Sequence, residues 1–255
     1  MNARPARDPA PDLASVSAVA HVFVDGLDDQ CELTGDDGHH LQRVRRLTRG
    51  ETITAADGSG AWRTYEVTAV GTGRLSLEAR GDVEMACEPR VGVSLAVALT
   101  KGGLEDVVAA VTELGARRIT LLRTARTVVR WDSARAGKAV VRLQAVAREA
   151  AMQSRRARIP MVAPILDLAA LADRAGLVVA ARDGVVASAL PPPDPNWPDG
   201  WTVVVGPEGG LAPEELEVLG SAPRLRLGPH VLRAVTAPVA AVAVLSAEVS
   251  RVRPE

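Results

Sequence analysis

The sequence contains few cysteines, few aromatic residues, no long apolar run and almost no net charge. Its two cysteines, Cys31 and Cys87, belong to no CxxC or Cys/His pattern, which argues against a disulfide framework and a structural zinc site. The apolar runs are too short to span a bilayer, so we expect a cytoplasmic protein with no membrane partner. The net charge of −1 gives no overall basic field of the kind that attracts nucleic acid.

Aromatic residues make up only 2% of the chain, so alanine, valine and leucine must form most of the core. Residues 1–20 are rich in Ala, Pro, Asp, Arg and Ser and lack the continuous apolar segment of a signal peptide. We predict that they form a disordered extension.

Residues 21–86 are predicted to form a small β-barrel domain. Short apolar segments alternate there with turn residues, and the Asp57-Gly58 pair between two of them is a hairpin signal. A brief helix is expected after Asp36. The expected strands are 21–24, 51–54, 62–67 and 75–77.

Residues 91–252 are predicted to form an α/β domain with a mostly parallel sheet covered on both faces, because strands alternate with helices. The expected strands are 93–99, 119–122, 177–181, 202–205 and 225–227. Helices are expected at 104–114, at 133–152, after Pro213 and at the C-terminal end.

Two glycine-containing loops follow consecutive predicted strands of this domain. Gly206-Pro-Glu-Gly-Gly210 comes after the strand 202–205, and Gly228-Pro229 comes after the next one. Ligands of open α/β sheets bind where such strands end, and glycine lets backbone amides approach them closely. Because neither loop has the P-loop or GxGxxG pattern, a phosphate-loop nucleotide enzyme or a nicotinamide enzyme is disfavoured. An empty tight turn remains the simpler alternative.

Arg233 lies between the second loop and the last helix, for which Thr236 is the predicted N-cap. Beside two glycine loops, its guanidinium is suited to an anionic or charge-developing ligand, although it could also pair with a surface carboxylate. His230 is a further candidate site residue. His39 and His40 have no third ligand in view, so no metal is expected.

Several arginines are clustered in spite of the low net charge. Arg43, Arg45 and Arg46 form one cluster and Arg155, Arg156 and Arg158 another. Taken alone, each is interpreted most simply as solvated surface.

The motifs VVVGPEGG at 203–210 and LGPHVLRAVTA at 227–237 together resemble those of the SPOUT superfamily of S-adenosylmethionine-dependent RNA methyltransferases. Over residues 21–250 the chain is more closely similar to the branch that methylates N3 of a uridine in 16S rRNA. Residues 37–46 with Asp57-Gly58 look like that branch's PUA-like RNA-binding barrel, and residues 150–160 resemble its EQSGR…IP segment.

The resemblance implies a C-terminal trefoil knot, a homodimer, S-adenosyl-L-methionine as cofactor and 16S rRNA of the small ribosomal subunit as partner. It also gives Arg233 and Glu208 catalytic roles, with Arg233 stabilising the N3 anion. The residues that it places around the cofactor are Val205, Gly206, Pro207, Glu208, Gly209, Gly210, Leu227, Gly228, Val231, Leu232, Thr236 and Ala237. Both arginine clusters then become RNA-binding candidates.

The chain departs from the family pattern at four positions. Ala234 and Val235 replace the usual Thr and Glu, and Met152 and Arg155 replace Glu and Gly. If a carboxylate at 235 were obligatory, the protein would be a non-catalytic RNA-binding member of the superfamily. A methyltransferase acting on another RNA, such as tRNA, is the second alternative.

Overall fold

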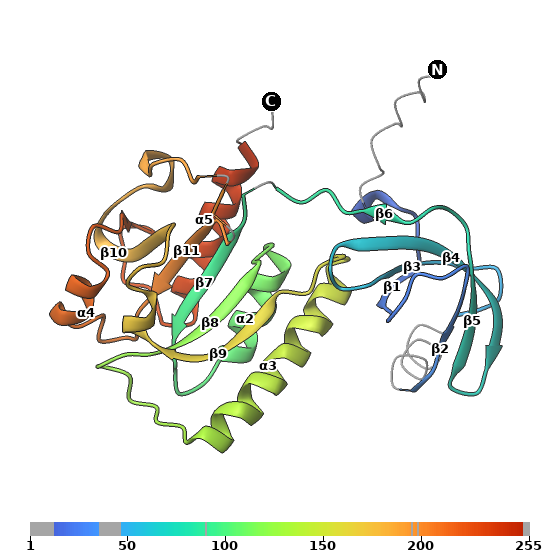
Figure 1. Ribbon diagram of the computed structural model, residues 1–255, viewed down its shortest axis with the longest axis horizontal. Coiled ribbons are helices and arrows are strands. Elements are labelled where there is room, and N and C mark those ends of the chain that lie inside the picture. The colour runs from blue at the N-terminus through green and yellow to red at the C-terminus, as the bar shows by residue number, and fades with distance from the viewer. Residues whose placement is uncertain (1–12, 36–46, 90, 195, 198, 252–255) are drawn as a thin grey trace. The chain divides into compact units, whose positions relative to one another are not determined.

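The computed structural model describes residues 13–35, 47–89, 91–194, 196–197 and 199–251, which fall into two compact units (Figure 1). The first comprises Met1–Glu88 and Ala151–Ile159, and the second Pro89–Ala150 and Pro160–Glu255. The sequence had placed residues 151–159 in the α/β domain. In the structure this segment folds with the N-terminal unit.

The first unit is built on a six-stranded sheet. Its strands are β1 (Ala20–Phe23), β2 (Gln30–Leu33), β3 (Thr52–Ala56), β4 (Ala61–Gly71), β5 (Arg74–Ala79) and β6 (Glu84–Met85). The strand order is β1-β3-β4-β5-β2, and β6 pairs with β4. Only β1 and β3 are parallel; the other pairs are antiparallel. Among the described residues β1 and β2 do not pair, so the predicted barrel is open between these two strands.

The predicted hairpin at Asp57-Gly58 is confirmed, since β3 and β4 pair across it. The Asp57 carboxylate accepts hydrogen bonds from the backbone N–H groups of Ser59, Gly60 and Ala61. Partial burial raises the pKa of Asp57, but the hydrogen bond from the Ser59 hydroxyl and these backbone bonds outweigh it and hold the pKa below its usual value. The turn is therefore fixed by a charged side chain. The helix expected after Asp36 lies outside the described residues.

The prediction of a disordered extension over residues 1–20 is wrong for residues 13–20, which begin with a 3₁₀ helix, η1 (Leu13–Ser15), and lead into β1. Residues 1–12 lie outside the described residues. Leu13 is only 4% exposed and belongs to a small apolar cluster with Phe23, Trp62 and Ala157. Met152 packs against the same cluster. This apolar contact accounts for methionine at a position where the family pattern has glutamate.

The chain turns sharply at the end of helix α3 (Ser133–Gln153). The N–H of Arg156 donates to Ala151 O (2.8 Å) and that of Arg155 to Met152 O (3.3 Å), the two bonds of a Schellman helix terminus. Arg155 has φ 55° and is the one non-glycine residue with positive φ among the described residues. Glycine is the usual residue in this conformation, which explains the glycine of the family pattern.

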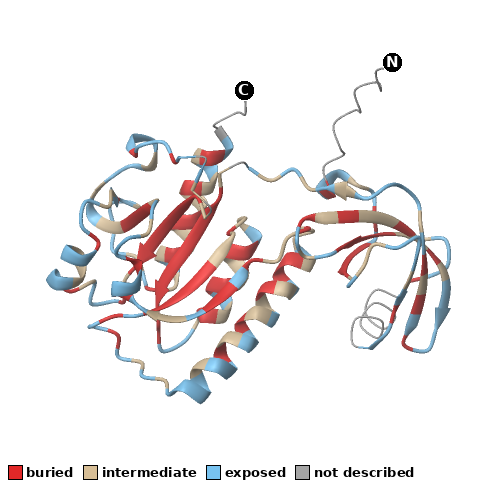
Figure 2. Ribbon diagram, in the orientation of Figure 1, coloured by how far each residue is buried: buried red, intermediate tan, exposed pale blue. Residues whose placement is uncertain are grey.

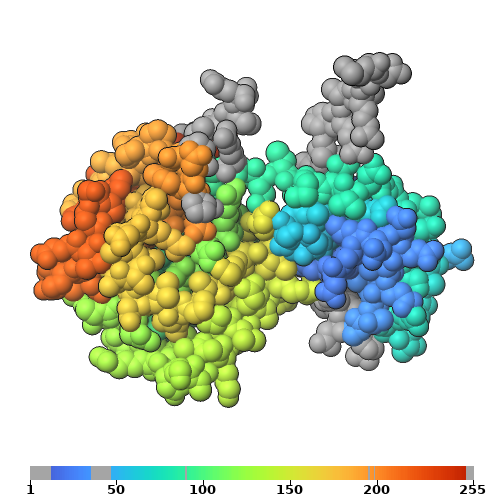
Figure 3. All heavy atoms as spheres, viewed as in Figure 1, coloured from blue at the N-terminus to red at the C-terminus, as the bar shows by residue number. Residues whose placement is uncertain are grey.

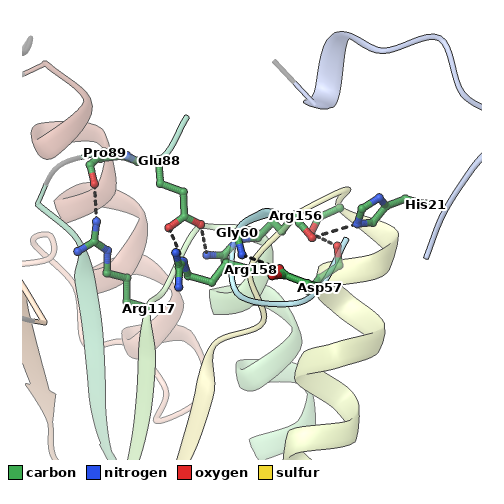
Figure 4. A network of polar contacts seen from close by, with 10 residues as sticks. His21, Asp57, Gly60, Glu88, Pro89, Arg117, Arg156 and Arg158 are labelled. Carbon is green, nitrogen blue, oxygen red and sulfur yellow. Dashed lines mark hydrogen bonds and ion pairs between the residues drawn. The ribbon is translucent and has the colours of Figure 1, made fainter. Parts of the chain in front are cut away.

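Two side-chain contacts hold this turn within the first unit. The Arg155 guanidinium donates to the carbonyls of Val16 (2.9 Å) and Ala18. His21 Nε2 lies 3.1 Å from the Arg156 carbonyl, which can only accept, so Nε2 carries the proton and Nδ1 accepts from Thr54 Oγ1 at 2.9 Å (Figure 4). Burial lowers the pKa of His21 to about 4, with a smaller contribution from the Arg155 charge, so the ring is neutral at pH 7.

The second unit contains a six-stranded sheet in which every pair is parallel, as predicted. Its strands are β7 (Val93–Ala98), β8 (Arg118–Arg123), β9 (Met161–Asp167), β10 (Leu177–Val185), β11 (Trp201–Val205) and β12 (Arg224–Leu225). The order is β12-β10-β11-β7-β8-β9. The chain therefore fills one half of the sheet outward from β7 and then builds the other half.

Helices cover both faces of this sheet (Figure 2). Leu95 and Val203 point to the face covered by α2 (Leu104–Glu113), α3 and α5 (Thr236–Arg251), whereas Ala96 and Val204 point to the face covered by η3 (Leu168–Leu171) and α4 (Pro213–Val218). Successive strand residues face opposite ways, so burial on both faces requires the continuous apolar runs seen in β7 and β11. A last short helix is η4 (Ala187–Ala189).

Candidate active site

A pocket of about 300 Å³ lies where β10, β11 and β12 end. Its volume is at the lower end of the range for small-molecule sites. The lining residues are Val179, Ala180, Ala181, Arg182, Asp183, Val205, Gly206, Pro207, Glu208, Gly210, Leu211, Leu216, Arg224, Leu227, Gly228, His230, Val231, Leu232, Ala234 and Ala237. The loops face the pocket as the sequence predicts for an open α/β sheet.

The first loop leaves the fully buried strand β11 and turns within five residues. Gly210 N–H donates to Pro207 O (2.8 Å), and Gly210 has φ 71°, which a residue with a side chain rarely adopts. Arg126 Nη1 donates to the carbonyl of Gly209 (2.7 Å) and so ties the loop after β8 to this one. In Figure 3, α4 forms the darker orange surface at the left edge of the view.

The start of α4 is fixed by Glu215. Its carboxylate accepts from Ala212 N–H (2.8 Å) at the beginning of the helix and from Ala125 N–H (2.7 Å) in the loop after β8. One side chain thus joins the residues that follow the first glycine loop in sequence to the loop after β8, which also contacts Gly209 through Arg126.

The second loop contains a glycine that protein packing does not require. A Cβ added to Gly228 would meet no protein atom within 4 Å, and its φ lies outside the left-handed region. Gly228 nevertheless lines the pocket. A side chain here would meet open space, and Gly228 also lines a neighbouring pocket together with Arg226 and Val244.

The segment 232–237 leads from this loop into α5. The carbonyl of Arg233 accepts from the N–H groups of Thr236 and Ala237 (both 2.9 Å), which starts the helix. Leu232 and Ala234 line the pocket on either side of Arg233, which is exposed and is not itself among the lining residues. The helix begins at Thr236 itself, one residue before the start expected from an N-cap at 236.

Val235 does not line the pocket and packs instead on the loop before α2. A Cβ added to Gly103, whose φ is 80°, would lie only 2.7 Å from Val235 Cγ1. Val235 is also counted among the half-buried side chains against the main core of the unit. An apolar residue therefore has a packing role at the position of the family's glutamate.

Most of the predicted cofactor residues line the pocket, and so do Glu208 and His230. Gly209, Thr236 and Arg233 do not. The sequence analysis missed the charged residues Arg182 and Asp183 of β10 and Arg224 of β12, which pairs with Asp183. Two of them directly follow the apolar run 177–181, so the strand-end rule that selected the glycine loops could have found them.

The structure describes only one of the two arginine clusters that were predicted to bind RNA. Arg43, Arg45 and Arg46 lie outside the described residues. Arg156 and Arg158 both pair with Glu88, at 3.4 Å and 3.0 Å, within the first unit (Figure 4). RNA binding by these arginines stays a prediction, and in the structure the second cluster holds residues 151–159 in place.

Within the described residues there is no group of three or more metal-ligating side chains. In the same part of the chain, no helix has the length and apolar character needed to cross a bilayer.

The fold and pocket define a class of protein that two family models describe. Residues 87–246 match an RNA methyltransferase domain, and residues 33–79 match an RNA methyltransferase PUA domain. The relatives identify a particular family within this class. The chain is 36% identical over 242 residues to the ribosomal RNA small subunit methyltransferase E of Mycobacterium tuberculosis, covering 90% of this chain and 92% of that one.

The Bacillus subtilis protein of the same name is 32% identical over 237 residues, covering 87% and 91% of the two chains. The chain therefore belongs to the ribosomal RNA small subunit methyltransferase E family.

Solved structures share the fold. A Legionella pneumophila protein with bound cofactor SAM has a TM-score of 0.77 at 26% identity, covering 91% of this chain and 98% of that one. The Neisseria gonorrhoeae ribosomal RNA small subunit methyltransferase E, bound to S-adenosyl methionine, has a TM-score of 0.77 at 24% identity, covering 90% and 97%.

Proposed function

We propose that this protein transfers a methyl group from S-adenosylmethionine to N3 of a uridine in 16S rRNA of the small ribosomal subunit. The observation that carries the proposal is Gly228, a pocket-lining glycine that neither the backbone conformation nor the packing requires. The family membership supplies the reaction, and this glycine leaves open space at the edge of the pocket for a ligand.

The residues present fit this cofactor. Leu227, Val231 and Leu232 offer apolar contacts, and the backbone of Gly206 and Gly228 offers hydrogen-bonding groups close to the pocket. When bound, the cofactor supplies a methyl group on a positively charged sulfur. The protein's own task is to hold the uridine N3 in line with that methyl group and to stabilise the loss of its proton.

Arg233 is the proposed catalytic residue. Loss of the N3 proton spreads negative charge onto the two uracil carbonyl oxygens, and a nearby guanidinium favours that anion. Its carbonyl is held by the first turn of α5, so the side chain starts from a fixed backbone position at the pocket edge. Glu208 is the second proposed catalytic residue, because it is the carboxylate of the first glycine loop and lines the pocket.

The remaining expectations belong to the same proposal. They are a trefoil knot in which α5 threads behind the glycine loops, a homodimer that completes the active site, and action in the cytoplasm on 16S rRNA of the small ribosomal subunit. The PUA-like unit and the two arginine clusters would contact rRNA.

The test is methylation of small subunits purified from a strain that lacks the gene. Purified protein and labelled S-adenosylmethionine are added, and the rRNA is digested for nucleoside mass spectrometry. We expect 3-methyluridine in 16S rRNA. Cofactor binding without any label in rRNA would contradict the proposal. It would favour another RNA target first and a non-catalytic role second, and for the latter the packing of Val235 on Gly103 is the specific observation.

Arg233→Ala should abolish turnover, with a loss of at least a hundredfold in kcat, because it removes charge stabilisation at the reacting base. Cofactor affinity, measured by calorimetry, should stay within about twofold. Arg233→Lys should keep part of the activity if positive charge is what matters. Arg174→Ala, which removes an arginine that pairs with Asp199 elsewhere in the unit, is the control. Full activity of Arg233→Ala would remove this residue from the mechanism.

A further inference from the structure

A second pocket, of about 390 Å³, lies in the same unit beside the start of α2 and the start of α3. Four cationic side chains line it, from Lys101, Arg130, Arg135 and Arg142. The lining includes one carboxylate, that of Glu105, which Arg142 already pairs at 2.6 Å. The pocket therefore carries a clear excess of positive charge although the chain as a whole is slightly acidic.

An aromatic ring completes this pocket. Trp131 is half-buried and packs with one part against the main core of the unit. The guanidinium carbon of Arg135 lies 5.7 Å from the centre of the ring, in a cation–π contact. A flat guanidinium held on an indole ring is a surface on which a nucleobase can stack.

Two of the cations are available for a ligand. Within the described part of the chain, Lys101 and Arg130 form no ion pair, and both are exposed. Gly102 lies between Lys101 and Gly103 on the same loop, and a Cβ there would meet no atom within 4 Å. The backbone beside Lys101 is thus open to close approach by a phosphate.

The position of the pocket relates it to the active site. Its floor includes Gly102 and Leu104, and the intervening Gly103 contacts Val235. Val235 is two residues from Arg233 and follows Ala234, which lines the cofactor pocket. One side of the segment 232–237 therefore faces the cofactor pocket, and the other side adjoins the loop that forms the basic pocket.

We propose that the basic pocket binds a nucleotide of a single-stranded RNA segment next to the target uridine. Lys101 and Arg130 contact its phosphate, and its base stacks on the Arg135–Trp131 pair. The inference rests on the proposed RNA methyltransferase function. It names a subsite for the RNA substrate, on the side of the segment 232–237 that adjoins the basic pocket. Single-stranded RNA is the favoured ligand because the pocket offers both a stacking surface and phosphate-binding cations.

The first test measures binding of a fluorescein-labelled uridine decamer at several salt concentrations, with S-adenosylhomocysteine present. Trp131→Leu keeps an apolar side chain on the core and should weaken binding about tenfold. Trp197→Leu is the matched control, because Trp197 is also half-buried against the same core but is not among the residues that line this pocket. It should lose similar stability and leave the affinity for RNA unchanged.

The second test separates the phosphate from the base. The double variant Lys101→Gln/Arg130→Gln should weaken binding and reduce the slope of log Kd against log salt by roughly 0.7 for each phosphate contact that is lost. Arg174→Gln is the charge control. An abasic ribose-phosphate decamer should lose its sensitivity to Trp131→Leu and keep its sensitivity to the double variant.

Competition with inorganic phosphate distinguishes a free anion from an RNA strand. Inorganic phosphate at about 10 mM is compared with unlabelled RNA that contains the same concentration of phosphate. If the two displace the decamer equally well, the site binds the anion alone and the nucleotide assignment is overturned. Equal RNA affinity in wild type and all pocket variants would also overturn it. Because binding is measured without methyl transfer, failure of the wild type to methylate subunits is a separate result that concerns the proposed function alone.

Discussion

The loop after β12 and the turn after α3 show opposite relations between backbone and residue type. Gly228 is a glycine where the backbone does not need one, and Arg155 is not a glycine where the backbone favours one. In the first case the missing side chain leaves space in a pocket. In the second, the guanidinium bonds to Val16 and Ala18 outweigh the strain of the left-handed conformation. Conformation alone therefore explains neither residue; the first points to a ligand and the second to long-range structure.

The largest effect is expected from filling the space at Gly228. Gly228→Leu should reduce S-adenosylmethionine affinity at least a thousandfold, about 4 kcal/mol, because a bulky side chain at this pocket-lining position narrows the space for the cofactor. The melting temperature should change by less than about 2 °C, since no protein atom is within reach of a Cβ there. Isothermal titration and thermal unfolding measure the two quantities.

Gly137→Ala in α3 is the control, because a Cβ at Gly137 also meets open space but lies in a helix. It should leave the affinity unchanged and stabilise the protein by about 0.5–1 kcal/mol. A Gly228→Leu variant that binds the cofactor normally would show that the second loop is not part of the cofactor site.

The next effect concerns the turn after α3 and its pH dependence. Because the folded pKa of His21 is about 4 and the unfolded value is 6.5, the unfolded state binds more protons between these values. The stabilising effect of the neutral ring is complete above pH 6.5 and is lost as the pH falls to about 4. It amounts to roughly 3 kcal/mol.

Urea unfolding of wild type and His21→Gln between pH 4 and pH 8 measures this contribution. The difference between the two proteins should shrink as the pH falls, with a slope of up to about 1.4 kcal/mol per pH unit. A difference that is constant across this range would mean that His21 does not stay neutral in the folded unit.

The smallest effects come from a pair of substitutions at Arg155. Arg155→Ala removes the guanidinium bonds and keeps the strain, so we expect a loss of about 2 kcal/mol in the free energy of unfolding. Arg155→Gly removes the same bonds but relieves the strain, and should be about 1 kcal/mol more stable than the alanine variant. Equal stability of the two variants would show that the left-handed conformation costs nothing at this position.

Much of the second unit could be predicted from the sequence, because its central strands are buried on both faces. The apolar runs of β7 and β11 and the spacing of Leu104, Val107 and Val111 in α2 give the order of elements directly. The edge strand β9 was missed because Pro164 interrupts it, and proline is tolerated in a sheet at its edge. The four-residue, mostly exposed β2 was missed for lack of an apolar pattern.

Contacts between distant parts of the chain could not be predicted in this way. Nothing in the local pattern of residues 151–159 shows that Ala157 packs with Trp62 or that the Arg156 carbonyl binds His21. The candidate site divides likewise. The glycine loops have a sequence signal, whereas the association of Arg126 with Gly209 and of Val235 with Gly103 requires the folded chain.

The discontinuity of the first unit has a consequence for biosynthesis. Its N-terminal segment leaves the ribosome well before residues 151–159, which supply Ala151 and Ala157 to the cluster around Trp62 and the carbonyl that binds His21. At about 5–20 residues per second, the nascent chain spends several seconds with this cluster incomplete. A fragment that ends at Glu88 would remain in that state permanently, with Trp62 and Phe23 uncovered. Chaperone binding and proteolysis should therefore concentrate on the incomplete unit during synthesis. An expressed fragment of this unit needs residues 151–159 as well, either in the same chain or as a separate peptide.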